Sequence, residues 1–566
     1  MMTNDSQLED SMASTGGLCE RANASAAPYI IMPAGHRQAT GPSSFVALWF
    51  PHFWAVIAVA LSLTGCSSPA PSVLGEDEFV GRPASAPRTG EAPAPRHGAL
   101  WYRIEPHPSK LRVHLRLLDP PPTATFFLPG PWAGHDDFAD RITIESAHGP
   151  DTALPLTIDH DEGRLDVEAG DVDWAELTYR VDTESARDPS NRFSPWSYDE
   201  AFFAYAPTIL VLPSAHIADQ LLDIPVEVHS PAAWTVAATW PLARHDVDEQ
   251  RHSSMTGFVA EDIRSLRDAF VSGGLHWERL DAPLPDGELT LTLAGDFTLD
   301  SQALMEATTT LTGEYVERFG DHHRISGLIL PLDTDNPNAR QGSGRRGGFV
   351  LEIPTDHPLD EYLLLLMAHE AFHMWNGHSL VPDADSRSDT KWFMEGVTHY
   401  VALKTLSQLG LVSERFVRRE LARTGQFYLR NPLVSGGTVR PVDRARLPYD
   451  RGVLIALAID RALLEYTDGT LEVEDWIDVL LSPGFADEAR AYDSATLRNA
   501  LDRLVGDVAI EPLHRYDDLV RRDETIDVAG LFHELGLHFL TASGGHSARL
   551  LPIDARTAPY ETIFGL

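Results

Sequence analysis

The chain has 566 residues, and its 83 acidic side chains against 45 basic ones give a formal net charge of -38. This charge argues against a nucleic-acid-binding protein, which needs a basic surface facing the phosphates, and against a polybasic protein of the membrane surface. The two cysteines, Cys19 and Cys66, are too few for a disulfide scaffold or a four-cysteine zinc module. The length is typical of about two to four domains, each able to bury a core.

In chain order, the first feature is an apolar run at 53–63 that leads into Leu-Thr-Gly-Cys at 63–66. The run is shorter than the about 20 residues of a membrane-spanning helix and has the length of a signal-peptide core. The four residues resemble a bacterial lipobox, which implies cleavage before Cys66 and a lipid on that cysteine. We therefore expect residues 1–65 to be a signal peptide with an over-long N-terminal extension. The alternative is a short buried helix with a chance cysteine.

Residues 66–98 are rich in Pro, Ala and Ser. Such a composition cannot bury enough apolar surface to fold, so we expect a tether between the lipidated Cys66 and the folded part. Ser67, with no Asp beside the cysteine, resembles the sorting pattern of Gram-negative outer-membrane lipoproteins. The sequence therefore predicts a lipid-anchored protein of the bacterial cell envelope, at the outer membrane and facing the periplasm or the surface.

Residues 99–300 contain short segments in which apolar and polar side chains alternate, separated by Pro, Gly and Asp. This period of two predicts antiparallel strands with one buried face, and hence a β-rich N-terminal domain. No cluster of catalytic residue types stands out in it. The clearest predicted strands are 111–118, 142–145, 224–228 and 289–294.

From residue 301 the apolar residues recur with the period of a helix, which predicts a second, mainly α-helical domain at 301–545. The fold class is thus α+β and multidomain. Residues 546–566 are expected to be a C-terminal tail, and no PDZ domain is evident. The predicted helices are 301–319, 357–376, 390–409, 450–467 and 492–505.

The segment Gly342-Ser-Gly-Arg-Arg-Gly347 matches the G-x-G-x-x-G pattern of dinucleotide-binding proteins. That pattern needs a strand before it and a helix after it. Here a loop rich in Asp, Asn and Pro precedes it, and a predicted strand at 349–353 follows. We therefore expect no nucleotide ligand.

The strongest chemical signal is His369-Glu370-Ala-Phe-His373, an H-E-x-x-H pattern late in an apolar helical stretch. A spacing of four places both imidazoles on one helix face, where both nitrogens can reach one Zn²⁺. Glu370 can take a proton from a water molecule at such a metal. The pattern alone also fits two histidines that merely flank a core helix.

A third ligand is available in Glu395, which lies among Trp392, Phe393 and Val397 on the next predicted helix. A carboxylate among apolar residues needs a partner, and a metal ion would be one. Two imidazoles and one carboxylate suit the open coordination of a catalytic zinc. Tyr449, at the start of a later helix, can donate a hydrogen bond to an oxyanion.

Three segments together resemble the glycyl aminopeptidase family of zinc metallopeptidases, which are gluzincins with a thermolysin-like catalytic domain. The resemblance implies one Zn²⁺ on His369, His373 and Glu395, with Glu370 as general base and Tyr449 as donor to the transition state. It covers about residues 100–540, including Pro129–Gly134 and Phe258–Asp268 upstream, and implies a β domain beside the catalytic one. The segments are His369–Asn376, Trp392–Tyr400 and Tyr449–Gly452.

The chain departs from this family at its substrate-binding strand. Related enzymes have a Gly-Gly-x-Glu strand whose glutamate holds the free amine of the substrate; here Gly347-Gly348 is followed by Phe and Val350, and Glu352 comes two residues later. One turn after the third ligand, many zinc peptidases place a carboxylate that orients an imidazole, whereas this chain has His399. Further candidates for orienting ligands or contacting substrate are Thr398 and Asn376.

We therefore predict a membrane-anchored zinc metallopeptidase that hydrolyses peptide bonds in a peptide or protein substrate, with no nucleic-acid partner. It is aminopeptidase-like, but without the amine-binding glutamate either endopeptidase or relaxed exopeptidase activity is open. The alternative is a non-catalytic envelope lipoprotein that keeps the peptidase fold for zinc binding or scaffolding.

Overall fold

The computed structural model describes residues 96–566 except 134, 185–191, 321, 486–490, 507–508, 543–546 and 554–558. The predicted signal peptide, Cys66 and the tether up to residue 95 lie outside the described residues. The end of the predicted tether belongs to the fold, because Arg96–His97 form a strand that pairs with Leu221–Leu222. None of the helices within the described ranges is long and apolar enough to span a membrane.

The N-terminal part is built of β-sheets, as the alternating pattern predicts. Its largest sheet has seven strands in the order β15-β16-β13-β2-β3-β8-β5, and only the β13–β2 pair in it is parallel. In β3, Leu111, Val113, Leu115 and Leu117 are buried while intervening residues reach the surface. The strands are β2 (Leu100–His107), β3 (Lys110–Leu118), β5 (Ile142–His148), β8 (Trp174–Asp182), β13 (Ile224–Pro231), β15 (Leu242–Asp248) and β16 (Ser253–Ala260).

Two four-stranded sheets complete this β-rich part, in the orders β14-β17-β10-β9 and β11-β4-β7-β6. A short parallel pair joins β1 (Arg96–His97) to β12 (Leu221–Leu222). The other strands are β4 (Thr123–Phe127), β6 (Leu156–Asp159), β7 (Arg164–Glu168), β9 (Trp196–Ser197), β10 (Ala201–Tyr205), β11 (Leu212–Pro213), β14 (Trp234–Ala238) and β17 (Phe270–Leu275). Short helices α2 (Ala206–Ile209), α3 (Ala215–Ala218) and α4 (Ile263–Arg267) connect strands.

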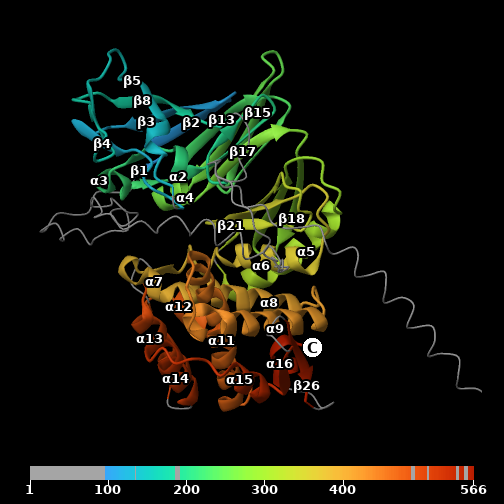
Figure 1. The fold of residues 1–566 in the computed structure, drawn as a ribbon. Helices are drawn as coiled ribbons and strands as arrows, with labels where there is room; N and C mark the ends of the chain where they lie inside the picture. The colour runs from blue at the N-terminus through green and yellow to red at the C-terminus, as the bar shows by residue number, and fades with distance from the viewer. Residues whose placement is uncertain are drawn as a thin grey trace, which may run out of the picture. The chain divides into compact units, whose positions relative to one another are not determined.

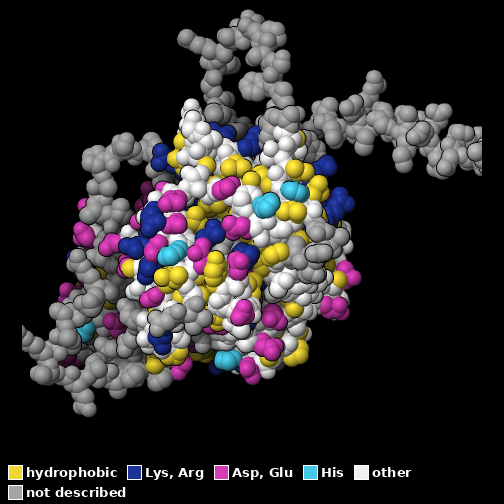
Figure 2. Space-filling model, turned by 90° about the horizontal axis from the view of Figure 1, so that it is seen from below, with side chains coloured by type: hydrophobic (Ala, Val, Ile, Leu, Met, Phe, Trp, Pro, Cys, Tyr) yellow, Lys and Arg dark blue, Asp and Glu magenta, His cyan; other side chains and the backbone are white. Residues whose placement is uncertain are grey.

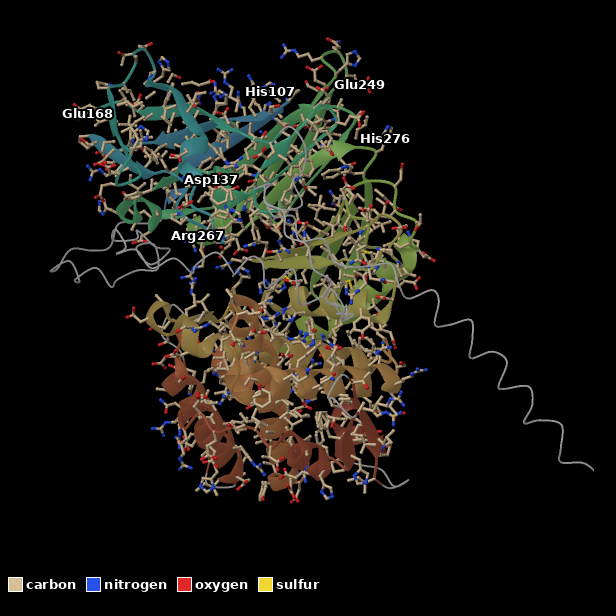
Figure 3. All side chains as sticks on the ribbon, in the orientation of Figure 1. His107, Asp137, Glu168, Glu249, Arg267 and His276 are labelled. Carbon is tan, nitrogen blue, oxygen red and sulfur yellow. The ribbon has the colours of Figure 1, made fainter. Side chains whose placement is uncertain are left out.

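Titratable side chains are dispersed over the β-rich part. Figure 3 shows His107, Asp137 and Glu168 well apart from one another, and away from Glu249 and His276. Among the described residues, one group of three metal-ligating side chains lies close together, and it belongs to the helical part.

The C-terminal part begins with a five-stranded sheet in the order β18-β19-β20-β22-β21. Two of its strands, β18 (Glu278–Leu284) and β19 (Gly287–Leu293), precede the first long helix. The same sheet therefore contains strands from both sides of residue 301, where the helical pattern begins. Figure 1 shows α5 (Ser301–Phe319) and α6 (Glu361–Phe372) against this sheet. The remaining strands are β20 (Arg324–Pro331), β21 (Gln341–Arg345) and β22 (Gly348–Ile353).

Helices form most of the rest of this part, which confirms the α+β fold class (Figure 1). A short parallel pair joins β23 (Val381–Pro382) to β24 (Ala491–Tyr492). The predicted helix at 301–319 is confirmed. The helix expected at 450–467 begins earlier, at Pro441, because Arg440 and Asp443 form a cap there. Pro448 lies inside this helix without ending it. The helices are α7 (Arg387–Lys391), π-helix η4 (Trp392–Val397), α8 (Thr398–Gln408), α9 (Glu414–Arg430), α10 (Pro432–Ser435), α11 (Pro441–Tyr466), α12 (Val473–Leu481), α13 (Ser494–Val505), α14 (Glu511–Tyr516), π-helix η5 (Asp517–Arg521) and α15 (Val528–Glu534).

The residues expected as a tail contribute to the fold. They include β26 (Ala548–Pro552), which pairs with β25 (Leu537–Thr541), and α16 (Pro559–Phe564). Ser407 of α8 donates a hydrogen bond of 2.7 Å to the carbonyl of Phe564.

In Figure 2, acidic, basic and hydrophobic side chains are interspersed over the described residues of the face viewed from below.

A buried charge cluster joins α8 to α11 and α12. Lys404 Nζ lies 2.9 Å from Asp460, 2.9 Å from Glu472 and 2.6 Å from Glu474. The Tyr400 hydroxyl donates to Asp460 at 2.6 Å. Because a buried charge is costly without partners, these contacts fix α8, and with it the preceding η4.

Helix α11 crosses η4 with no room for a side chain between them. A Cβ atom added at Gly452 would lie 2.7 Å from the Cα of Gly396, and one added at Gly396 would lie 2.7 Å from the carbonyl carbon of Gly452. Both distances are shorter than real Cβ contacts. Glycine at these two positions therefore sets the separation of the two helices.

We expect Gly452→Ala to lower the free energy of unfolding by about 1–3 kcal/mol, since an added methyl group must push the two backbones apart. Gly313→Ala in α5 is the matched control, because the nearest atom to its Cβ would be 3.9 Å away. That variant should be neutral or gain up to about 1 kcal/mol from helix propensity. Thermal and urea unfolding of the full chain measure both, and equal stabilities would contradict the close crossing.

Candidate metal centre

Helix α6 presents the two histidines of the H-E-x-x-H segment. Its first turn is capped by Asp360, whose side chain accepts from the amide of Leu363 at 2.8 Å, and nearly all its residues are buried. His369 lies in the last turn, and His373 caps the C-terminus. Their Nε2 atoms are 3.1 Å apart, so both rings point to one place.

Glu395 comes from η4 and completes the cluster. Its Oε2 atom lies 3.6 Å from the Nε2 of His369 and 3.5 Å from that of His373. Single π-turns inside helices are frequent at functional sites, and this one re-aims the carboxylate at the imidazoles. One ligand atom from each of the three residues lies within 4.8 Å of the others.

This donor set fits a zinc ion. Two imidazole nitrogens and one carboxylate oxygen are the three protein ligands of many catalytic zinc sites, with the fourth position left for water or substrate. The Nδ1 atom of His373 lies 2.9 Å from the carbonyl oxygen of Asn376, which leaves Nε2 to face the cluster. Zinc-binding histidines commonly have this second interaction, because it fixes the ring orientation.

The charges of the three possible ligands affect one another's pKa values. Burial lowers the pKa of His369 to about 3. Burial also opposes a charge on His373, but its hydrogen bond with Glu395 and the charge of Glu395 raise the pKa of His373 to about 9. Burial likewise disfavours a charged Glu395, yet hydrogen bonds from His369 and His373 hold the pKa of Glu395 well below its usual range. A metal ion would therefore displace a proton from His373.

Glu370 lies between the histidines on α6, with only 4 % of its surface exposed. Burial raises its pKa above the usual range. A carboxyl group of raised pKa is better suited to accept a proton near neutral pH. Helix α6 runs close to β21, where a Cβ at Gly342 would lie 2.7 Å from the Cδ of Glu370 and one at Gly344 would lie 2.5 Å from the Cβ of His373. The glycine-rich segment thus serves the close approach of this strand to the site.

Tyr449 of α11 faces the same cluster. Its ring centroid is 6.2 Å from that of His369, with the two planes 27° apart. Burial, with added effects from the charge of Glu395 and a hydrogen bond to it, raises the pKa of Tyr449 well above its usual value. The hydroxyl therefore stays protonated and can act as a hydrogen-bond donor.

Asn376 and Thr398 connect the end of α6 to η4 and α8. The Nδ2 atom of Asn376 donates to the carbonyl of Phe393 at 2.9 Å and to the Oγ1 of Thr398 at 3.1 Å. All three atoms of this contact are buried. These two residues tie together the helices that carry the ligands.

His399 lies beside His369, with 5.6 Å between ring centroids. Its Nε2 is 3.4 Å from Oε1 of Glu420, and Arg423 donates to the other oxygen of Glu420 at 2.8 Å. Where many zinc peptidases have a carboxylate beside the ligand histidine, this chain has the imidazole of His399. The buried carboxylate of Glu420 contacts the far side of that imidazole. Sequence reasoning missed Glu420 because α9 carries many charged residues, and nothing in the sequence separates this buried glutamate from those at the surface.

Gly347, Gly348 and Glu352 lie farther from the metal ligands. Gly347, with φ of 80°, forms the turn between β21 and β22. Along β22, Leu351 and Ile353 pack into the core beneath α6, so Glu352 points to the opposite face of the sheet. There the side chain of Gln341 donates a hydrogen bond to it. The structure does not bring Glu352 to the imidazole cluster.

The β-rich part contributes residues that sequence reasoning did not assign. Arg192 donates to the carbonyl of Gly342. Asp268 lies 3.4 Å from the Nδ1 of His378, whose Nε2 is 3.3 Å from the carbonyl oxygen of Gly344. The guanidinium carbon of Arg345 lies 4.6 Å from the ring centroid of Trp132. Both upstream segments that resemble the family therefore contact β21. Trp132 does so through Arg345, and Asp268 does so through His378.

Comparison with known proteins agrees with this geometry. A search of curated protein sequences finds no match. Among solved structures, an aminopeptidase N family protein from Idiomarina loihiensis is similar, with 18% identity, a TM-score of 0.61, and 78% of this chain and 79% of that chain covered. A mutant M1 zinc metallopeptidase from Deinococcus radiodurans, bound to a Tyr-Ser-Ala substrate, has 14% identity and a TM-score of 0.50, with 77% of this chain and 95% of that chain covered. At these identities the likeness establishes the fold.

The family model described as M61 glycyl aminopeptidase matches residues 362–443. This segment contains His369, Glu370, His373 and Glu395. The resemblance to the glycyl aminopeptidase family is therefore confirmed, over the segment that holds the metal-ligand cluster and the neighbouring glutamate.

Proposed function

We propose that this protein is a zinc-dependent peptidase that hydrolyses peptide bonds. The observation that carries the proposal is the convergence of His369, His373 and Glu395 on one point, with the buried carboxyl of Glu370 beside them. The match to an aminopeptidase family over residues 362–443 supports it.

The chemistry divides among the side chains of the site. A zinc ion on the three ligands would polarise the scissile carbonyl and favour ionisation of a nearby water. Glu370 accepts the proton of the attacking water and later returns it to the leaving amine. Tyr449, kept protonated by burial, donates a hydrogen bond to the oxygen on which negative charge develops.

Glu352 does not take the place of the amine-binding carboxylate of related aminopeptidases. Glu352 faces away from α6 and accepts a hydrogen bond from Gln341. A free amine of the substrate therefore gains nothing from this residue. We propose that the enzyme does not require a free amino terminus, so that it acts as an endopeptidase or a relaxed exopeptidase.

We expect Glu370→Gln to keep one zinc ion per chain and to lower kcat by about 10²–10⁴, because the amide cannot accept the proton. Glu317→Gln, at an exposed position of α5, is the matched control and should retain full turnover. His373→Ala should lose zinc as well as activity. Elemental analysis and a peptide-cleavage assay with chelator and zinc addition measure these outcomes; full turnover by Glu370→Gln would refute the assigned base.

A second test concerns the amino terminus. The same peptide is offered with a free and with an acetylated amino terminus, and the rates of cleavage at each bond are followed by mass spectrometry. We expect acetylation to change kcat/KM by less than about tenfold, since the loss of a charged hydrogen bond would cost at least that much. Cleavage confined to free-amine peptides would show that the enzyme is an obligate aminopeptidase.

We further propose that the mature protein is attached to the bacterial envelope by a lipid on Cys66. The support is the apolar run at 53–63 and the lipobox-like residues after it. We expect Cys66→Ser to move the protein from the membrane to the soluble fraction and to abolish incorporation of labelled palmitate. Cys19→Ser is the matched control and should change neither. Equal membrane association of the Cys66→Ser variant would rule out the anchor.

A further inference from the structure

Arg192 extends from the β-rich part to the metal site. One of its terminal nitrogens donates to the carbonyl of Gly342. Gly342 is the residue of β21 that faces Glu370, with space for no side chain between them. The guanidinium therefore lies at the edge of the strand next to the proposed general base.

The charge of Arg192 acts on the catalytic side chains. Burial raises the pKa of Glu370, and the positive charge of Arg192 is among the influences that lower it. The same charge also acts against the raised pKa of Tyr449, which is caused first by burial. Arg192 thus lies within electrostatic range of both side chains.

A second guanidinium strengthens the positive potential. Arg345, at the end of β21, is 7 % exposed and lies 4.6 Å from the ring centroids of both Trp132 and Tyr205. Cations are favourably placed against aromatic rings in this way, so the charge is held rigidly. Strand β21 itself carries no carboxylate, and its charged side chain is this arginine.

The nearby carboxylates already have other partners. Glu352 accepts from Gln341, Asp268 lies against His378, and Glu395 lies against both ligand histidines. Within the described ranges, Arg192 forms no ion pair with a carboxylate, and its buried Nε has no hydrogen-bond partner there. It is also only partly buried, so a ligand can reach it.

We propose that Arg192 is a specificity-determining residue that binds a carboxylate of the substrate close to the scissile bond. A guanidinium offers paired donors that match a carboxylate, and it repels the ammonium group of a free amino terminus. The preferred substrates are therefore peptides with Asp, Glu or a free carboxyl terminus within a few residues of the cleaved bond. This inference rests on the proposed peptidase function.

The alternative role for Arg192 is purely structural: its hydrogen bond to Gly342 would only join the β-rich part to β21. The two roles have different signatures in a substrate series. Loss of a purely structural hydrogen bond lowers kcat/KM by the same factor for all peptides. Loss of a contact with a substrate carboxylate lowers kcat/KM selectively for acidic peptides. The ratio of acidic to neutral kcat/KM separates them.

The test uses a neutral peptide, acetylated and amidated, and a set in which Asp, Asn or Lys replaces one residue at each position near the scissile bond. The wild type should cleave the best Asp peptide at least about tenfold faster in kcat/KM than its Asn counterpart, as expected for a charged hydrogen bond. In Arg192→Gln this ratio should fall to about one. Arg192→Lys should keep part of it, because the charge remains without the fork of donors.

Arg251→Gln is the matched control, since Arg251 is 84% exposed in the β-rich part; it should keep the wild-type ratio. Peptides ending in an acid or an amide distinguish a terminal carboxylate from a side-chain one. An unchanged acid-to-neutral ratio in Arg192→Gln, with melting temperature preserved, would overturn the proposal, as would a wild type without preference.

Binding to the Glu370→Gln variant separates this inference from the proposed function. Fluorescence anisotropy of labelled Asp and Asn peptides reports recognition without cleavage. If the wild type cleaves no peptide but the acidic one binds about tenfold tighter in an Arg192-dependent way, the peptidase proposal fails and the carboxylate site stands. If peptides are cleaved but the Glu370→Gln variant binds both equally, the carboxylate site fails alone.

Discussion

The metal site depends on a backbone contact between two helices. Gly396 and Gly452 meet at the crossing of η4 and α11, where a Cβ on either would collide with the other. Glu395 directly precedes the first glycine, and Tyr449 lies one turn before the second. The distance between Glu395, the proposed metal ligand, and Tyr449, the proposed oxyanion donor, is therefore set by main-chain atoms, which cannot adjust as a side chain can.

The same device recurs on the other side of the site, where Gly342 and Gly344 bring β21 against α6. At both close approaches, glycine residues allow the backbone of one element to lie directly against the helix that carries the proposed site residues. As a result, the acid–base group, the ligands and the strand edge are preorganised by packing. Preorganisation of this kind is what allows charge development in a reaction without further rearrangement.

The charged groups on the two sides of the histidine cluster differ in their balance. Behind His369, the buried His399 contacts Glu420, whose charge is balanced by Arg423. In front, Arg192 and Arg345 surround the strand edge. The charges beside His399 are thus balanced within the protein, while the edge of β21 retains the positive charges of Arg192 and Arg345.

The sequence was most informative where function depends on neighbours along one helix. His369, Glu370 and His373 follow from a spacing of four, and the apolar surroundings of Glu395 indicated its burial. Tyr449 required a family resemblance, because a single tyrosine has no local pattern. Arg192, Asp268 and Glu420 could not be predicted, since each reaches the site through tertiary contacts from distant or arginine-rich segments.

Secondary structure shows the same limit. Helix α5 was predicted with its observed bounds, because an N-cap Asp300 and a terminal Gly320 bracket a regular apolar pattern. The expected start of a helix at 390 instead falls within a helical run from Arg387, where a π-turn interrupts the α-helical hydrogen-bond pattern. Such a turn serves the position of Glu395 and leaves no mark in the apolar periodicity.

The hairpin of β18 and β19 has a consequence for dissecting the chain. Its strands come before residue 301, yet β19 pairs in parallel with β20 and supplies Leu289, Leu291 and Leu293 to the core that α6 packs on. A fragment cut where the helical pattern begins would lose these leucines and leave β20 as a bare sheet edge, prone to pair with other chains. The smallest autonomous unit of the helical part must therefore include the hairpin from Glu278 onward.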